Sequence, residues 1–454
     1  MILRNTTMAQ IAIALSSFLV PFIGSALNLA LPQIGRDLGM NVVTLGLMVS
    51  AYLLPCAMFQ MPAARLGDLY GRRKIFLLGV GGFTLFSFLS SLAWSSTTLI
   101  AFRALTGVSS AMMFGTAIAI LTSLFPLQQR GKVLGINTTV VYSALSIGPI
   151  LGGLLTHYLG WRSIFVACCA ISATAFTFSL IAIRDEWAEA RGEPFDLVGS
   201  ALYALMLFAV ICGFSLLPDT TSWMLLILGI IAAIVFVRYE ARHRFPVFKL
   251  DLLVNNRAFR LSTIAAMINY SATSASTFLL SLYLQSVRGL DAQHAGFLLV
   301  LQPIIQTLVS PLAGRWSDRV HPASLATAGM SMVTLALFGL CFLTENTPWL
   351  MFVALLLLLG AGFGIFSSPN VNMIMSSVDK AAYGTASAVT GTARLIGQSF
   401  SIGIATLAIH LYLGTASITP AQHAAYMSSL RLTCAVFAAL CLVGNYASAA
   451  RLKK

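Results

Sequence analysis

The chain is poor in charged residues. Of its 454 residues only 9% are Asp, Glu, Lys or Arg, whereas a soluble domain usually has about 25%. Apolar residues make up 58% of the chain, and the mean hydropathy is +0.87. These values exclude a water-soluble fold around one apolar core. They predict an all-α polytopic membrane protein, in which each spanning helix uses about 20 mostly apolar residues.

The sequence also lacks the patterns of most enzymes and metal proteins. Its seven cysteines are odd in number and lie in apolar stretches without metal-ligand spacing, which excludes a disulfide framework and a zinc site. No glycine-rich phosphate loop is present, so direct coupling to ATP is excluded. The Ser, His and Asp residues are dispersed and form no nucleophile motif. We therefore expect no enzyme activity, no catalytic residues, no cofactor and no metal.

Acidic residues are absent from the apolar stretches, and all fourteen fall in loops or at the ends of predicted helices. Proton-driven export of a cation needs a buried carboxylate for which the proton and the cation compete. No predicted span offers such a group. His410, Asp291 or an acid group of the substrate itself are the remaining candidates for proton coupling.

Fourteen apolar stretches predict fourteen transmembrane helices. They cover residues 8–30, 42–63, 75–94, 97–124, 133–157, 162–183, 195–217, 221–238, 260–286, 292–313, 322–343, 347–367, 384–411 and 427–449. The first stretch is too long for a cleavable signal peptide, and no small-residue cleavage site follows it. An even number of spans places both termini on the same side.

The basic residues indicate which side that is. With the N-terminus inside, most of the 27 Lys and Arg residues lie in cytoplasmic segments, as the positive-inside rule requires. The net charge of +13 thus follows from topology, and we expect no nucleic-acid partner. We predict a multi-pass protein of a bacterial-type cytoplasmic (inner) membrane, with both termini in the cytoplasm.

Two loops of similar sequence follow the second and the tenth predicted helix. Residues 64–68 read ARLGD, and residues 314–319 read GRWSDR. The loops are equivalent if residues 1–184 and 256–454 each form a six-helix bundle, and residues 185–255 form a linker with two inserted transmembrane helices. Repeated halves with a binding site between them are typical of secondary transporters.

At these residues the sequence resembles the major facilitator superfamily. The run DLYGRR at 68–73 is similar to its cytoplasmic loop signature, and Arg103 with Gly107 resembles its motif with a membrane-embedded arginine. The run GPILGG at 148–153 resembles its antiporter motif. Three further runs, NLALP (28–32), GWRSIF (160–165) and RLIG (394–397), resemble the fourteen-helix drug:proton antiporter branch of that superfamily, which is of the multidrug efflux type.

The resemblance implies a major facilitator fold of 6 + 2 + 6 helices, export by alternating access and a monomer. A loop carboxylate can pair with nearby guanidinium groups in one state and release them in the other. We therefore predict that the two loops act in gating, through Arg65, Asp68, Arg72, Arg73, Arg315, Asp318 and Arg319. The alternative is a pair of solvated loops without a switching role.

The antiporter motif combines a small-xxx-small step with a proline. Gly148 and Gly152 permit close helix approach, Pro149 favours a bend, and Gly153 completes the motif. By resemblance it implies an exporter; the alternative is plain helix packing. The related antiporters usually carry an acidic residue five positions before Asn28, where this chain has Ile23.

Arg103 and Arg394 are the two charges that fall within predicted spans. A charge at membrane depth normally faces a cavity or a partner, and neutral polar residues recur at helical spacing on several spans. The alternative is that these groups only join helices. We predict a substrate cavity that contains Ser25, Asn28, Arg103, Tyr142, Asn269, Tyr270, Gln302, Gln306, Arg394 and Gln398.

The sequence thus predicts a secondary active transporter in the lipid bilayer that exports small amphipathic organic compounds, a drug or a toxic metabolite, with coupling to protons left open. An interior with two arginines and no carboxylates suits a neutral or anionic compound. One alternative is a carrier of an endogenous organic anion, working by uniport or anion exchange without proton antiport. The other is a non-transporting receptor or lipid-handling protein on the same scaffold.

Overall fold

The computed structural model describes residues 2–125, 127–215, 220–247, 254–317, 319–378, 383–414 and 418–451; at some helix positions, Tyr142 among them, it describes only the backbone. These residues form helices and no strand. In chain order the helices are α1 (Ile2–Leu38), α2 (Val42–Tyr70), α3 (Arg72–Ser91), α4 (Ser96–Leu124), α5 (Leu127–Leu159), α6 (Arg162–Ala182), α7 (Leu197–Ser215), α8 (Thr220–Glu240), α10 (Arg257–Leu282), α11 (Ala292–Leu299), α12 (Leu301–Trp316), α13 (Pro322–Leu340), α14 (Trp349–Ser376), α15 (Tyr383–Leu413) and α16 (His423–Ala449). A π-helical turn, η1 (Tyr283–Val287), continues α10, and a 3₁₀ turn, η3 (Pro420–Gln422), precedes α16.

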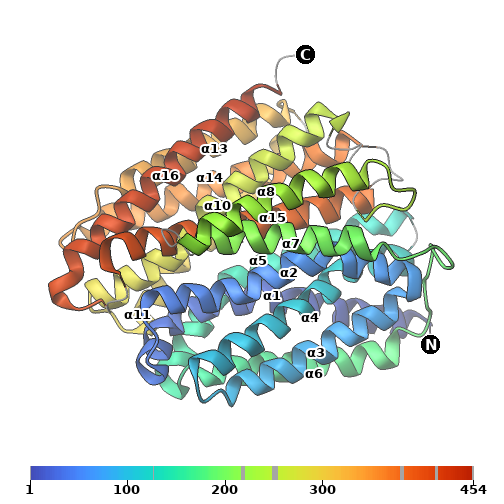
Figure 1. Ribbon diagram of the computed structural model, residues 1–454, viewed down its shortest axis with the longest axis horizontal. Helices are drawn as coiled ribbons and strands as arrows, with labels where there is room; N and C mark the ends of the chain where they lie inside the picture. Colours follow the sequence, from blue (N-terminus) through green and yellow to red (C-terminus); the bar gives the residue numbers. More distant parts are fainter. Residues whose placement is uncertain are drawn as a thin grey trace.

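The long helices run along one common direction, so the molecule has two ends (Figure 1). Both chain termini lie toward the same end of the helices, with C at the top of the view and N at its right, and we call this the terminal end. The opposite end, where α11 lies, is called the distal end. The distal end carries the turns at 39–41, 92–95, 160–161, 288–291 and 341–348.

Thirteen stretches of the described helices are long and apolar enough to cross a membrane, which confirms the predicted polytopic all-α fold. The predicted span 260–286 is present as α10 and η1, although α10 is not among the thirteen. Its buried face carries Ser262, Asn269 and Ser276. These polar side chains face neighbouring helices, so α10 needs less apolar surface than a lipid-facing helix. The predicted span 292–313 consists of α11 and α12, which meet at Val300.

The contacts among α1–α6 recur among the later helices. In the first group α1 packs on α5 and α6, α2 packs on α4, and α3 packs on α4 and α6. In the second group α10 packs on α15 and α16, α12 packs on α14, and α13 packs on α14 and α16. The repeated pairing follows the same helix order as the repeated loop sequences.

The two groups meet along two seams, one between α2 and α15 and the other between α5 and α11–α12. Helices α7 and α8 form a hairpin, and α7 contacts both α2 and α15. It lies in the middle of the molecule in Figure 1, drawn in green. The Tyr203 hydroxyl donates to the Ala57 carbonyl at 3.3 Å, and the Phe214 ring lies 5.3 Å from that of Phe400. The hairpin thus lies along the first seam.

Small residues set the spacing between helices. Lipid tails are as apolar as leucine side chains, so helices in a bilayer associate through close packing. A Cβ atom on Gly107 would stand 2.3 Å from the Tyr52 carbonyl oxygen, where α4 crosses α2. A Cβ atom on Gly329 would stand 2.6 Å from the Gly362 carbonyl oxygen, where α13 crosses α14. At such places the backbones themselves are in contact.

This packing predicts that Gly107→Ala lowers the stability of the protein. The added methyl group meets the α2 backbone, which has no side-chain freedom to yield, and overpacking of this kind costs about 1–3 kcal/mol. Gly24→Ala is the matched control, because nothing lies within 4 Å of its Cβ position. We expect a lower unfolding midpoint in detergent for Gly107→Ala only; equal midpoints for the two variants would contradict the packing.

Candidate functional site

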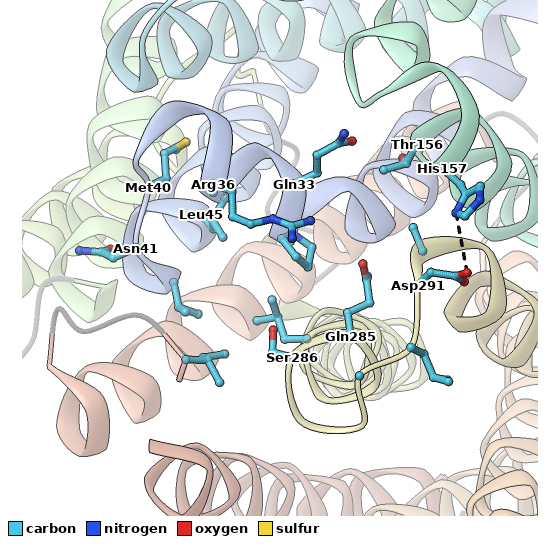
Figure 2. Close-up of a pocket in the computed structure, with 18 residues that line it drawn as sticks. Gln33, Arg36, Met40, Asn41, Leu45, Thr156, His157, Gln285, Ser286 and Asp291 are labelled. Carbon is cyan, nitrogen blue, oxygen red and sulfur yellow. Dashed lines mark ion pairs between the residues drawn. The ribbon is translucent and has the colours of Figure 1, made fainter. Parts of the chain in front are cut away.

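A cavity of about 660 Å³ opens at the distal end, between the two groups of helices. Such a volume lies within the range of small-molecule sites, about 300–1,000 Å³. Helices α1, α2 and α5 line one side, and α10, η1 and the start of α11 line the other (Figure 2). Its polar lining residues are Gln33, Arg36, Asn41, Thr156, His157, Gln285, Ser286 and Asp291.

Gln33 is positioned by the run that begins α6. Its Oε1 accepts a hydrogen bond from the backbone N–H of Trp161 at 3.0 Å. Trp161 is 1% exposed, its Nε1 donates to Asp37 Oδ2 at 2.9 Å, and the Arg162 guanidinium stacks 4.3 Å from its ring centre. The GWR run therefore fixes the distal end of α1, on which Gln33 and Arg36 stand.

Gln285 lines the opposite wall and connects to α1 through a hydrogen-bond chain. Gln285 Nε2 donates to Ser281 Oγ at 3.1 Å, and Ser281 Oγ donates to the Asn28 carbonyl oxygen at 2.6 Å. This chain joins α10 to α1 one helical turn deeper than Pro32, the first α1 residue in the lining. It ties the two groups of helices together at the bottom of the cavity.

The cavity carries charge on opposite walls. Asp291 Oδ1 lies 2.8 Å from His294 Nδ1, and Asp291 Oδ2 lies 3.7 Å from His157 Nδ1. The hydrogen bond from the His294 backbone N–H is the main cause that lowers the pKa of Asp291, so this carboxylate is ionised at neutral pH. No acidic side chain of the described residues lies within ion-pairing distance of Arg36. Asp291 thus lies between two histidines, whereas Arg36 is open to an anionic ligand.

The antiporter motif lies on α5 beside the cavity and packs on both sides. A Cβ atom on Gly148 would overlap Ser25 Oγ, at 1.8 Å, and one on Gly152 would stand 2.5 Å from Ala26 Cα. On the other face a Cβ atom on Gly153 would stand 2.6 Å from the carbonyl oxygen of Ala292. The motif thus brings α5 into backbone contact with α1 and with α11 of the other group. Pro149 takes part as well, because its carbonyl oxygen lies against Gly296.

The residues predicted to form the cavity lie deeper in the molecule. None of those with described side chains lines the distal cavity, and the Tyr142 side chain lies outside the described residues. Six of the others are buried, namely Ser25, Asn28, Arg103, Asn269, Gln302 and Gln306. Asn269 Nδ2 contacts Met330 Sδ at 3.4 Å, the Tyr270 ring packs against Phe363, and Ser25 Oγ donates to the Pro21 carbonyl oxygen. Gln398 is half-buried on α15. Their contact with a substrate stays a prediction.

The two membrane arginines face aromatic rings. Arg103 is 1% exposed, and its guanidinium lies 4.3 Å from the ring centre of Tyr52, whose hydroxyl is 3.0 Å from Ser110 Oγ. The Arg394 guanidinium lies 5.2 Å from the ring centre of Phe114. The Phe114 ring stands on α4 and Arg394 on α15, so this contact joins the two groups. Cation–π contacts of this kind stabilise a desolvated arginine without a carboxylate.

The first of the two loops predicted to act in gating, between α2 and α3, forms ion pairs with the segment that follows α6; the two are called the first and second gating loop below. Arg72 Nε lies 2.8 Å from Asp68 Oδ1, and Arg72 Nη1 lies 3.0 Å from Glu189 Oε1. Arg72 also donates to Ser123 Oγ at 3.1 Å. The Ala190 backbone N–H donates to the Asp68 carbonyl oxygen at 3.0 Å. The loop is therefore paired within the first group and with the linker.

Two further glutamates of the linker contact the same loop. Arg65 Nη2 lies 2.6 Å from Glu193 Oε2, and the Arg73 backbone N–H donates to Glu186 Oε1 at 2.9 Å. Gly71 adopts φ +119°, and a Cβ atom there would stand 2.4 Å from the Glu186 carboxyl group. The positive φ favours glycine at this position, and a larger residue would also displace the Glu186 side chain.

The second gating loop differs from the first. Arg315 and Arg319 are exposed and have no ion-pair partner among the described residues, while Asp318 lies outside them. Asn372 Nδ2 donates to Ser317 Oγ at 3.1 Å, which joins the end of α14 to this loop. The two loops are thus similar in sequence, but the linker binds only the first within the described chain.

Sequence reasoning missed most of the cavity. Gln33, Arg36, His157 and Gln285 stand near helix ends, where polar residues are expected to face water, and no motif marks them. It also placed Asp196 and Glu240 among solvated helix-end acids, whereas both are buried where the α7–α8 hairpin begins and ends. The sequence signal that could have located this cavity is Arg36, because it is one of few basic residues on the side opposite the termini.

Two groups of helices with repeated pairing and a cavity between them define the architecture of a membrane transporter. The chain belongs to the major facilitator superfamily, because the model of that family matches residues 13–402. This confirms the family that the motifs resemble. Membership makes a small-molecule substrate and the lipid bilayer its partners.

Relatives of this chain carry different compounds. It is 29% identical to the riboflavin transporter RibZ of Clostridioides difficile over 405 residues. The matched region covers 89% of this chain and 88% of that protein. It is 29% identical over 451 residues to the cephamycin export protein CmcT of Amycolatopsis lactamdurans, covering 95% and 90%. Others are named as drug resistance and export proteins. The fold is similar to a solved bacterial homologue of the lysosomal transporter Spinster, with a TM-score of 0.67 and 15% identity over 99% of this chain and 98% of that chain.

The linker contacts predict that the triple variant Glu186→Gln, Glu189→Gln, Glu193→Gln releases the linker from the first gating loop. Each partly exposed ion pair contributes about 0.2–1 kcal/mol, and a loss of 1–2 kcal/mol corresponds to a factor of about 5–30. We expect the amide of Ala190 to exchange its hydrogen faster by this factor, as measured by mass spectrometry. Asp185→Asn is the control, because Asp185 forms no ion pair within the described chain; unchanged exchange in the triple variant would contradict the docking.

Proposed function

We propose that the protein is a secondary active transporter that exports small amphipathic organic compounds, neutral or anionic, by alternating access. The cavity between the two groups of helices carries this proposal. Its lining combines apolar residues with neutral polar ones, and its basic residue Arg36 has no ion-pair partner among the described residues. A guanidinium group binds carboxylate and phosphate oxygens through charge-assisted hydrogen bonds, so the cavity favours anions over cations.

We further propose that residues 1–184 and 256–454 act as the two moving bundles of a monomer, with 185–255 as the insertion. The distribution of basic residues supports cytoplasmic termini, which makes the distal cavity the outer mouth of the pathway. In the opposite state the pathway would open from the terminal end towards Asn28, Arg103, Tyr270, Gln302 and Arg394. The paired loop at Asp68 would then rearrange with the bundles.

The second candidate is a carrier of an endogenous organic anion that works without proton antiport. One observation favours it: Ile23, which stands where related antiporters usually have an acid, is fully buried among apolar side chains. Proton-linked export would therefore need a titrating group elsewhere. The two candidates differ in whether a pH gradient drives substrate movement.

The test is transport by the purified protein in liposomes with an imposed pH gradient. The panel holds riboflavin as a neutral compound, a cephamycin as a carboxylate anion and ethidium as a cation. We expect flux of the first two and proton movement in the opposite direction. Flux that ignores the pH gradient would favour the anion carrier, and flux of ethidium alone would overturn both candidates.

Arg36→Gln is expected to weaken cephamycin transport more than riboflavin transport. Loss of a hydrogen bond to a charged group costs about 1.5–3 kcal/mol, which corresponds to a rise in KM of about 10–100-fold. The control is Arg431→Gln, which removes the same charge from an exposed position outside the cavity. Equal effects of the two variants on cephamycin KM would show that Arg36 does not bind the anion.

A further inference from the structure

One ion pair joins the two groups of helices at the mouth of the cavity. His157 is near the distal end of α5, in the first group, and Asp291 caps α11, in the second. His157 Nδ1 lies 3.7 Å from Asp291 Oδ2, and each side chain is 38% exposed. The pair is therefore open to water from the distal side, and Figure 2 shows it as the dashed contact.

The packing of α5 explains why these two side chains meet. Gly153 and His157 are four residues apart, and residues at this spacing lie on the same face of a helix. The Gly153 position is in backbone contact with Ala292, the residue after Asp291. The close approach of α5 to α11 thus places the imidazole of His157 beside the carboxylate.

Three further side chains stand around the pair. His294, on α11, contacts the other carboxylate oxygen at 2.8 Å. The Tyr158 ring packs edge-on against the His157 ring at 4.7 Å, and Arg36 stands across the cavity on α1. No second acidic group of the described residues pairs with His157. A histidine is the side chain that ordinarily changes charge between pH 5 and 8.

We propose that His157 and Asp291 form the proton-coupling site of the transporter, with the proton as the ligand that His157 binds from the distal side. This inference rests on the proposed function. Protonated His157 attracts the Asp291 carboxylate and strengthens the existing contact between α5 and α11 at this edge of the cavity mouth. Neutral His157 lacks that attraction, so this contact is weaker and the two helices separate more easily.

The sign of the coupling follows from this contact. Low pH on the distal side charges His157 and favours the closed mouth, so a proton-loaded, empty transporter turns its pathway to the terminal side. On that side, where the pH is higher, His157 releases its proton and substrate binds. Proton and substrate thus favour opposite states without competing for one atom. No carboxylate inside a span is needed.

The experiment compares two modes of transport in liposomes, with riboflavin and cephamycin as probes. Counterflow exchanges substrate for substrate and needs no proton cycle, whereas gradient-driven flux does. We expect His157→Gln to lower the gradient-driven flux roughly tenfold or more relative to counterflow by the same variant, within the usual range of coupling between two sites. Asp291→Asn is expected to behave in the same way.

His423→Gln is the matched control. His423 Nδ1 lies 3.6 Å from Glu345 Oε1, and both residues belong to the second group of helices, so this pair does not cross the cavity. We expect the control to keep both modes of transport.

Retained gradient-driven flux in His157→Gln overturns the inference and leaves the proposed function intact. Loss of counterflow in this variant assigns His157 to structure or substrate binding and also overturns it. Absence of counterflow in the wild-type protein, with both probes, overturns the proposed function itself.

Discussion

The structure depends on the backbone contact that α5 makes with α1 on one side and with α11 on the other. Gly148 and Gly152 allow the first contact, and Gly153 allows the second. In a bilayer no hydrophobic force draws helices together, so such small-residue contacts determine how closely they pack. The α5 contacts therefore set both the width of the distal cavity and the separation of its two walls. A larger side chain at any of these glycines would push α5 away from its neighbours and alter the shape of the cavity, even though none of the polar lining residues had been replaced.

Charge placement follows from the same packing. The α5 face that touches α11 continues to His157, and the start of α11 supplies Asp291. The end of α1 is held in another way: Trp161 is buried beneath it, and the Trp161 backbone N–H donates a hydrogen bond to Gln33. Sequence runs that resemble family signatures thus act here as supports, and the polar groups that face the cavity stand beside them.

The sequence was sufficient for the fold because spanning helices have a strong signal: long apolar stretches and a basic bias in one set of loops. The motif glycines also mark real close contacts, as at Gly107 and Gly152. The cavity was less predictable, because Arg36 and Gln285 acquire a role only when α1 and α10 end side by side. Burial of Asp196 depends likewise on how α7 packs against α8 in the hairpin, and the sequence around Asp196 contains no motif that predicts this packing.

The buried arginines show how this chain does without acids in its spans. Arg103 lies over Tyr52 and Arg394 over Phe114, so aromatic rings replace the carboxylates that would otherwise pair with them. A ring stabilises a cation but carries no net charge, and the positive potential of each arginine therefore persists in the interior. At the distal end Arg36 adds to that potential, and Asp291 lies between two histidines. The buried positive charges are the reason for proposing a neutral or anionic cargo for this member of the major facilitator superfamily.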